Sequence, residues 1–378
     1  METRVQIIDF NHQIHTFYHS QHRLSVRVNM GGVVVEKDTT IHNGCIKNLY
    51  KWSKSGKYPT AVCFDRAVPA RKAYWSGKFP DMTGTNGYKG NREKMPEQMF
   101  EAVTDCERIL RQAGVSCYAV QNYEADDLIF ACIQRAKEKY PGCPIDVVTN
   151  DADLLPLVDD TVSVFLRSKT GTFAVSKDLE KAHYVQVTPD NYQDVVERLS
   201  AYKGFMIPYN SLLLHKILRG DTSDHFGRKE ISKMFPPTKY NAMIAKMLED
   251  GVDFSNTFRY GSTSYKIVYR ETGEEFPGSM QEALASPDKD KLVKRISPPE
   301  QLTAILELLK KYSKLSDEQL DMVSHIYTGM NLNQDYPART PEFNRRAYVV
   351  GEANDIKPFD EFALQDAVRP LQIRLLKA

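Results

Sequence analysis

The chain has almost no net charge, and this limits what the molecule as a whole could attract. Its 50 Lys and Arg residues are matched by 49 Asp and Glu residues, so the formal net charge at pH 7 is +1. The broad basic field that draws many proteins to nucleic acid is therefore absent. Any attraction to nucleic acid has to come from a local cluster of charge.

Paired cysteines and long apolar runs are also lacking. The six cysteines form no Cys-x-x-Cys pair, which favours reduced, buried thiols in a cytoplasmic protein. No apolar run reaches the roughly 18 residues that a membrane span needs. Strand-like sequence begins almost at once, without the leader of a secreted protein. We therefore expect a cytoplasmic monomer with no membrane partner.

What the sequence does contain is a set of short apolar runs that lead into acidic residues. Such runs are typical of parallel strands covered by helices on both faces. Four runs lead into seven acids, which are Asp9, Asp65, Glu124, Asp126, Asp127, Asp151 and Asp153. Because ligands bind outside the carboxyl ends of such strands, these side chains are expected to meet in one crevice. That much like charge requires neutralising cations, so the sequence predicts a divalent-metal site.

The acids also indicate which metal and which chemistry to expect. Oxygen ligands suit Mg²⁺ or Mn²⁺. These turns carry no paired Cys or His residues, which argues against zinc. The carboxylates outnumber what one ion needs, and two ions about 4 Å apart clamp both oxygens of a phosphoryl displacement. Phosphodiester hydrolysis is therefore the leading chemistry. A single Asp at a strand end is more often a cap or turn residue, but four independent runs argue against that reading for the set.

A basic and aromatic segment between residues 66 and 94 follows the second acid. Its seven cations stand against two acids, with Tyr74, Trp75, Phe79 and Tyr88 interleaved. Cations follow the phosphates of a single strand while aromatic rings stack on its bases. A solvated basic loop is the alternative, and the neighbouring acid crevice favours the nucleic-acid interpretation.

Four histidines repeat at helical spacing early in the chain. They are His12, His15, His19 and His22, separated by three, four and three residues. Adjacent pairs could chelate a metal, but no acidic or cysteine partner is evident near them. We interpret them as a partly exposed polar stripe on the first helix.

Six short motifs occur in order over about the first 226 residues. They are Ile8–Asn11, Phe64–Arg66, Tyr88–Arg92, Glu124–Asp127, Val148–Leu154 and Gly220–Asp224. Together they resemble the flap endonuclease and 5′→3′ exonuclease family, in the style of the phage and bacterial 5′ nucleases. The resemblance implies an α/β, PIN-like nuclease domain over residues 1–190, with a mostly parallel sheet and a helical arch at about 67–100. A helical DNA-binding region over 191–330 and an extension of unknown role over 331–378 would follow.

The resemblance also implies roles for individual residues. Asp221 and Asp224 would join the seven acids as ligands of two or three Mg²⁺ ions, which Mn²⁺ could replace. Lys89 and Arg92 would contact the scissile phosphate and, with Asp151 and Asp153, form the catalytic set. The residues expected to contact DNA are Arg66, Arg71, Lys72, Tyr88, Lys89, Arg92, Arg228 and Lys229.

The chain departs from the family after Asp224. Family members usually continue into a Gly-rich helix–hairpin–helix that binds duplex phosphates and often K⁺. The stretch His225–Glu230 contains a single glycine. We therefore treat this motif as degenerate and do not expect the K⁺ site.

The resulting prediction is a Mg²⁺-dependent, structure-specific 5′ nuclease. Its substrates would be branched, nicked or single-strand-ended DNA in replication or repair, and RNA·DNA hybrids at primers would use the same machinery. A polymerase or a single-strand-binding protein is the protein partner to test, and a phage-encoded chain would act in the host cytoplasm. The alternatives are a PIN-type ribonuclease, disfavoured by the Gly220–Asp224 motif and the arch, and a non-catalytic DNA-structure-binding protein, disfavoured by the full set of acids.

Overall fold

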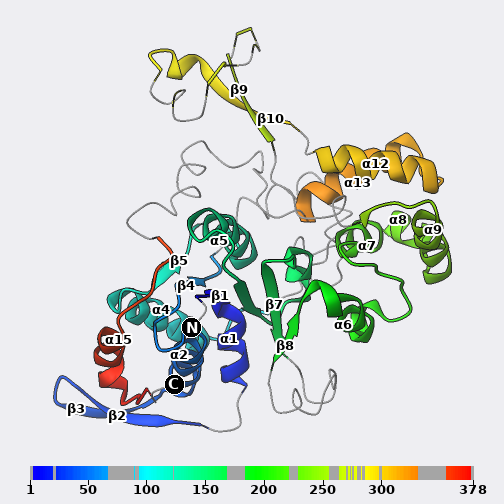
Figure 1. Ribbon diagram of the computed structural model, residues 1–378. Helices are drawn as coiled ribbons and strands as arrows, with labels where there is room; N and C mark the ends of the chain where they lie inside the picture. Colours follow the sequence, from blue (N-terminus) through cyan, green and yellow to red (C-terminus); the bar gives the residue numbers. More distant parts are fainter. Residues whose placement is uncertain are drawn as a thin grey trace.

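The computed structural model shows an α/β body, a helical region beside it and two projecting hairpins (Figure 1). It describes residues 3–19, 23–66, 89, 93–121, 123–167, 184–220, 229–254, 264–269, 271–272, 274, 276–278, 282, 286–297, 300–330 and 355–375. Of the helices in these ranges, none combines the length and the apolar character that a membrane span needs.

The body is built on a six-stranded sheet whose strand order is β5-β4-β1-β6-β7-β8. The strands are β1 (Val5–Asp9), β4 (Thr60–Cys63), β5 (Ser116–Tyr118), β6 (Ile145–Thr149), β7 (Val162–Arg167) and β8 (Tyr184–Val187). All neighbours pair in parallel except β7 and β8. The prediction of a mostly parallel sheet flanked by helices is confirmed. The carboxyl ends of β4, β1 and β6 consequently lie side by side.

Helices cover both faces of this sheet, which explains why its central strands are apolar throughout. Along β1, Val5 and Ile7 face one core with α5 (Ala125–Lys139), whereas Ile8 faces the other core. The second core is formed with α1 (Phe10–Tyr18), α2 (Thr40–Trp52) and α4 (Glu97–Gln112). A strand buried on both faces needs apolar residues on both, so its sequence shows no alternation.

A third core holds the helical region together. It is formed by α7 (Leu212–Arg219), α8 (Lys229–Met234), α9 (Pro237–Glu249), α12 (Glu300–Tyr312) and α13 (Asp317–Met330). The connecting elements η2 (Pro189–Asn191), α6 (Tyr192–Arg198) and η3 (Ser200–Tyr202) lie between it and the sheet, and Tyr192 and Tyr202 are buried in the first core. The domain limits drawn from the sequence stay a prediction.

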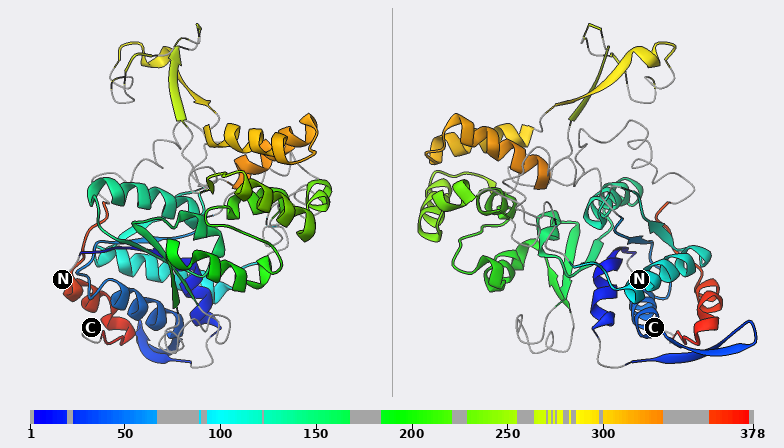
Figure 2. Two further views of the ribbon diagram at one scale, coloured as in Figure 1. Left: turned by 45° about the vertical axis from the view of Figure 1, so that its right-hand side comes forward. Right: turned by 180° about the vertical axis from the view of Figure 1, so that it is seen from behind.

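Two antiparallel hairpins extend from opposite ends of the molecule (Figure 2). One joins β2 (Ser25–Met30) to β3 (Val33–Asp38), and the other joins β9 (Ser264–Tyr269) to β10 (Leu292–Ser297). The second hairpin lies between residues 251 and 297, a stretch that is rich in Gly, Ser, Thr and charged residues.

Residues 355–375 return from the helical region to the body, where α15 (Glu361–Val368) lies beside α4 (Figures 1 and 2). The Lys357 carbonyl accepts a hydrogen bond from the Thr60 amide at 3.2 Å, and the Phe359 amide donates to the Gly56 carbonyl at 3.0 Å. Gly56 has a φ of +82°, and a Cβ there would lie 2.4 Å from the Phe359 carbonyl oxygen. Glycine is therefore required where this segment docks.

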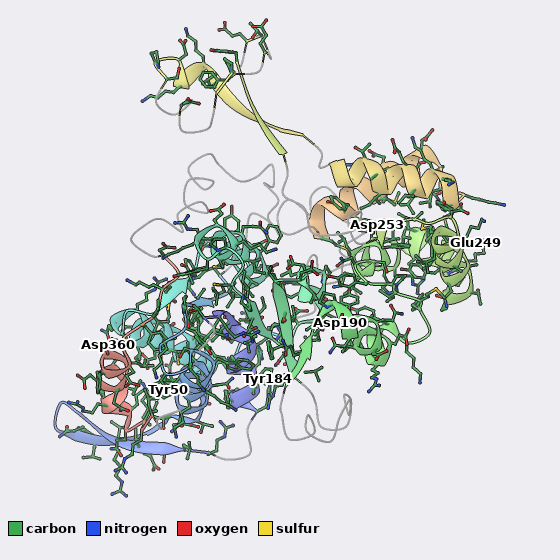
Figure 3. The ribbon with its side chains drawn as sticks, viewed as in Figure 1. Tyr50, Tyr184, Asp190, Glu249, Asp253 and Asp360 are labelled. Carbon is green, nitrogen blue, oxygen red and sulfur yellow. The ribbon has the colours of Figure 1, made fainter. Side chains whose placement is uncertain are left out.

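Side-chain contacts fix the same segment (Figure 3). Tyr50 of α2 donates to Glu361 at 2.8 Å, and Asp360 caps the first turn of α15 by accepting from the Phe362 amide. Asp355 forms ion pairs with Arg135 and Lys139 of α5. The segment is thus part of the second core rather than a loose appendage.

Candidate active site

The acids at the strand ends are held in place by backbone and side-chain hydrogen bonds. Asp9 ends β1, caps α1 and accepts a hydrogen bond from the Thr149 hydroxyl at 2.8 Å. Asp65 follows β4 and accepts from the Ala125 amide at 2.7 Å. Asp151 follows β6 and caps η1 (Ala152–Leu157) by accepting from the Asp153 amide at 2.8 Å. These hydrogen bonds fix the three carboxylates at the carboxyl ends of their strands, two of them as helix caps.

Five of the nine predicted metal ligands line one cavity of about 610 Å³. They are Asp9, Asp65, Glu124, Asp126 and Asp151. The rest of the lining consists of Asn11, His12, His15, Tyr18, His19, Lys89, Glu93, Lys94, Met95, Pro96, Met99 and Ala125. The topology therefore gathers acids from three strand ends and the start of α5, as the sequence suggested that it would.

Three carboxyl groups of this cavity have pKa values above their ordinary range. Burial, with a contribution from the charge of Asp65, raises the pKa of Asp9 to about 6. Burial and the charge of Glu124 raise the pKa of Asp65, and burial together with Asp151 and Asp9 raises the pKa of Asp126. These raised pKa values mean that the ionised form of each carboxyl group is disfavoured in the cavity. A divalent cation bound among them would stabilise the ionised form.

His12 lies between two of these acids. Its Nε2 is 3.4 Å from Asp9 Oδ2 and 3.7 Å from Asp151 Oδ2. Although burial opposes it, the charges of Asp9 and Asp151 raise the pKa of His12, and His12 in turn holds the pKa of Asp151 below its ordinary value despite burial. The interpretation of the histidines as a stripe without acidic partners is wrong for His12.

Lys89 contributes a cation from the basic segment. Its Nζ lies 2.6 Å from Glu124 Oε1, and both side chains are largely buried. Lys89 has a φ of 54°, in the left-handed region, which is uncommon for a residue with a Cβ. The side chain predicted to contact the scissile phosphate therefore lies inside the acid-lined cavity.

Asp127 and Asp153 have other partners. Asp127 Oδ2 accepts a hydrogen bond from the Glu124 amide at 3.1 Å, which closes a capping box at the start of α5. Asp153 forms an ion pair with Lys216 of α7, whose side chain is 6% exposed. Neither Asp127 nor Asp153 lines the cavity. Lys216 belongs to none of the six motifs, although a lysine inside the apolar run Leu212–Leu218 is a sequence signal for a buried ionic partner.

The remaining predicted residues are either engaged elsewhere or outside the described ranges. Arg66 forms an ion pair with Glu107 of α4, which also binds Arg111 at 3.0 Å. Lys229 begins α8. The positions that lie outside the described residues are Arg71, Lys72, Tyr88, Arg92, Asp221, Asp224, Arg228 and His22.

The donor set fits a divalent cation by its chemistry. The lining acids provide only oxygen ligands, as Mg²⁺ and Mn²⁺ prefer. Within the described ranges, no three His, Cys, Asp or Glu side chains already stand in the arrangement that would hold an ion. The number of ions, and the contributions of Asp221 and Asp224, therefore stay predictions.

Comparison with known proteins finds a family model and several relatives that this chain resembles. Residues 4–186 match the model of the 5′-3′ exonuclease N-terminal, resolvase-like domain. The chain is 33% identical over 110 residues to a 5′-3′ exonuclease of Halalkalibacterium halodurans, covering 29% of this chain and 35% of that protein. It is 28% identical over 139 residues to DNA polymerase I of Lactococcus lactis subsp. lactis, covering 37% of this chain and 14% of the polymerase.

Among solved structures, the flap endonuclease of bacteriophage T5 in complex with DNA and metal ions is similar. The identity is 13% and the TM-score is 0.45, with 98% of this chain and 99% of that chain covered.

Proposed function

We propose that this chain belongs, through residues 4–186, to the 5′-3′ exonuclease family and that it is a divalent-metal-dependent, structure-specific 5′ nuclease. Its substrates are branched, nicked or single-strand-ended DNA, and RNA·DNA hybrids are a related substrate class. The observation that carries the proposal is the cavity that collects five acids from β1, β4, β6 and α5 together with Lys89.

The acids of the cavity hold the metal in this proposal. Asp9, Asp65, Glu124, Asp126 and Asp151 supply oxygen ligands from elements that the sheet keeps rigid. When bound, Mg²⁺ or Mn²⁺ ions lower the pKa of a water and stabilise the charge of a phosphoryl transition state. Burial, and to a lesser extent the neighbouring acids, raise the pKa of Asp9, Asp65 and Asp126, and a bound cation would offset both effects by stabilising the ionised carboxylates.

Residues around the acids orient them and supply positive charge. Thr149 donates to Asp9, and Asn11 accepts from the Asp65 amide at 3.2 Å, so both acids are held toward the cavity. The ammonium group of Lys89 lies in the cavity beside Glu124, where a scissile phosphate would also lie. There it stabilises the negative charge that develops during hydrolysis.

One experiment tests this function against its rivals. The purified chain is given Mg²⁺ and end-labelled 5′-flap, nicked duplex, single-stranded DNA, single-stranded RNA and RNA·DNA hybrid side by side. We expect cleavage near the 5′ ends of the flap and nicked substrates, and none in EDTA. Cleavage of single-stranded RNA alone would favour the ribonuclease alternative, and binding without cleavage would favour the non-catalytic one.

A matched pair of variants assigns the activity to the cavity. Asp151→Asn should abolish cleavage while binding to the flap substrate in Ca²⁺ is preserved. Asp160→Asn alters an exposed acid in the same segment and should cleave at the wild-type rate. Full activity in Asp151→Asn would contradict the metal assignment.

A further inference from the structure

His12 of α1 places an imidazole nitrogen among the acids of the cavity. Its Nε2 lies 3.4 Å from Asp9 Oδ2 and 3.7 Å from Asp151 Oδ2, and all three residues line the cavity. The His12 side chain is 33% exposed, so an ion entering from solvent can reach it. Imidazole is a common metal ligand, and a site that contains it does not select the same ions as a site of carboxylates alone.

The start of α1 holds this imidazole in place. His12 is the third residue of the helix, and its backbone amide donates to Asp9 Oδ1 at 3.4 Å. Asp9 also accepts from the Thr149 hydroxyl, and Asp151 accepts from the Asp153 amide. The imidazole therefore faces two carboxylates that other groups already hold.

The separations among these groups are close to those of ligands around one ion. Ligands about 2.1 Å from an ion lie about 3.0–3.6 Å apart when they meet at angles of about 90–120°. The three groups do not already stand in the arrangement that would hold an ion, but the separations of 3.4 Å and 3.7 Å leave only a small side-chain movement to make. A shared ion would supply the attraction that draws them together.

The charges around His12 are compatible with this role. Without a cation, the two carboxylates favour a positive charge on the imidazole. A divalent cation bound between them supplies that charge in its place, and imidazole then binds the ion in its neutral form, as metal ligation requires.

A nitrogen ligand also changes which ions the site prefers. Mg²⁺ takes oxygen ligands and keeps several of its waters. First-row transition ions accept imidazole readily, with an affinity that rises from Mn²⁺ to Co²⁺. One histidine among the acids therefore favours these ions over Mg²⁺.

We propose that His12 is a nitrogen ligand of a metal ion that Asp9 and Asp151 also hold, and that it makes the cavity prefer Mn²⁺ and Co²⁺ to Mg²⁺. The proposal rests on the proposed nuclease function, which places divalent cations among these acids. His12 adds to that function a choice of ion, which carboxylates alone would not make.

Metal binding by the full chain without nucleic acid tests the assignment. Electron spin-echo spectroscopy of the Mn²⁺-loaded protein detects a bound nitrogen through its hyperfine coupling. We expect this coupling in the wild type and its loss in His12→Gln, because the amide of glutamine binds metals through oxygen. His12→Asn provides a second variant with the same expected loss.

Calorimetric titration of the same proteins measures the choice of ion. His12→Gln should weaken the binding of Mn²⁺ and Co²⁺ about tenfold or more, at least the loss seen when a group that only orients a ligand is removed. The affinity for Mg²⁺ should change less, so the preference for Mn²⁺ over Mg²⁺ should fall.

His325 of α13 provides a matched control. Its Nε2 lies 3.4 Å from Asp321 Oδ2 and its side chain is 32% exposed, much as for His12, but it does not line the cavity. His325→Gln should keep both the nitrogen coupling and the ion affinities of the wild type.

Three outcomes would overturn the proposal. They are a wild type without nitrogen coupling, a coupling that persists in His12→Gln and His12→Asn, and equal losses of Mn²⁺ and Mg²⁺ affinity in those variants. A wild-type protein that shows the coupling but cleaves none of the substrates would instead contradict the nuclease function and leave the ligand assignment standing.

Discussion

Lys216 of α7 forms an ion pair with Asp153, so a buried cation from the helical region neutralises an acid of the motif that follows β6. The lysine side chain is 6% exposed and that of Asp153 is 28% exposed. The pair joins the two parts of the molecule next to the cavity. For Asp153 to bind a metal ion, that ion would have to replace Lys216 as the partner of the carboxylate.

Removing one member of this pair should destabilise the protein more than removing both. Asp153→Asn leaves the Lys216 charge buried, and we expect a loss of about 2 kcal/mol, below the 3–5 kcal/mol of fully buried pairs because Asp153 retains contact with water. The double variant with Lys216→Met should lose less than the sum of the single variants. Urea unfolding of all four proteins gives the coupling free energy. Additive losses would mean that the pair contributes nothing.

Asp9 links the site to the pH dependence of stability. Its ordinary pKa of 3.8 rises to about 6 in the folded protein, so the folded state binds more protons than the unfolded state between these values. Stability is therefore lost as pH rises through this window, by about 3 kcal/mol for a shift of about two units. Asp9→Asn, which keeps a capping side chain, should be more stable than the wild type at pH 8 in EDTA and inactive.

The comparison at two pH values isolates this effect. At pH 4, where Asp9 is protonated in the folded protein, the stability advantage of Asp9→Asn over the wild type should shrink. Added Mg²⁺ should raise the melting temperature of the wild type at pH 8 more than that of the variant. If Asp9→Asn is instead less stable than the wild type at pH 8, the ionised Asp9 carboxylate does not destabilise the folded protein.

Lys89 is expected to act on the transition state rather than on substrate binding. Lys89→Ala should lower kcat about 10²-fold or more, the scale for removal of one charged donor, with little change in KM. Lys57→Ala removes an exposed lysine and serves as the control. Steady-state kinetics on the flap substrate separate the two constants, and a change confined to KM would make Lys89 a binding residue only.

The segment 355–375 should behave as part of the core. Leu364 of α15 is fully buried against the second core, so Leu364→Ala should cost about 2–5 kcal/mol of unfolding free energy. Phe362→Ala, two residues earlier on the same helix but 73% exposed, should cost almost nothing. Chemical denaturation of both variants checks this. Equal stabilities would mean that the segment is a detachable appendage.

The sequence could predict the sheet and the acid cavity because both follow from local patterns. Buried parallel strands leave nearly continuous apolar runs, and the carboxyl ends of neighbouring strands share one edge. Asp9, Asp65 and Asp151 could therefore be grouped without knowing any distance. The helix over Glu97–Gln112 follows from a local pattern too, since its apolar residues recur at helical spacing and lie buried in the structure.

The parts that the sequence could not predict depend on docking between distant segments. His12 gains its second acidic neighbour from Asp151, 139 positions later, and Lys216 reaches Asp153 only because α7 packs beside η1. Asp127 could equally be a ligand or a cap by type, and the structure shows it in a capping box at the start of α5. Nothing in the sequence of residues 331–378 indicates that α15 docks beside α4.

The return of residues 355–375 to the sheet has a consequence for how the protein is made. The strands and the cavity acids are synthesised first, the helical region next, and the residues that complete the second core last. A chain still on the ribosome therefore holds every acid of the cavity while its second core is open beside α4. The second core is therefore complete only after residue 375 has emerged.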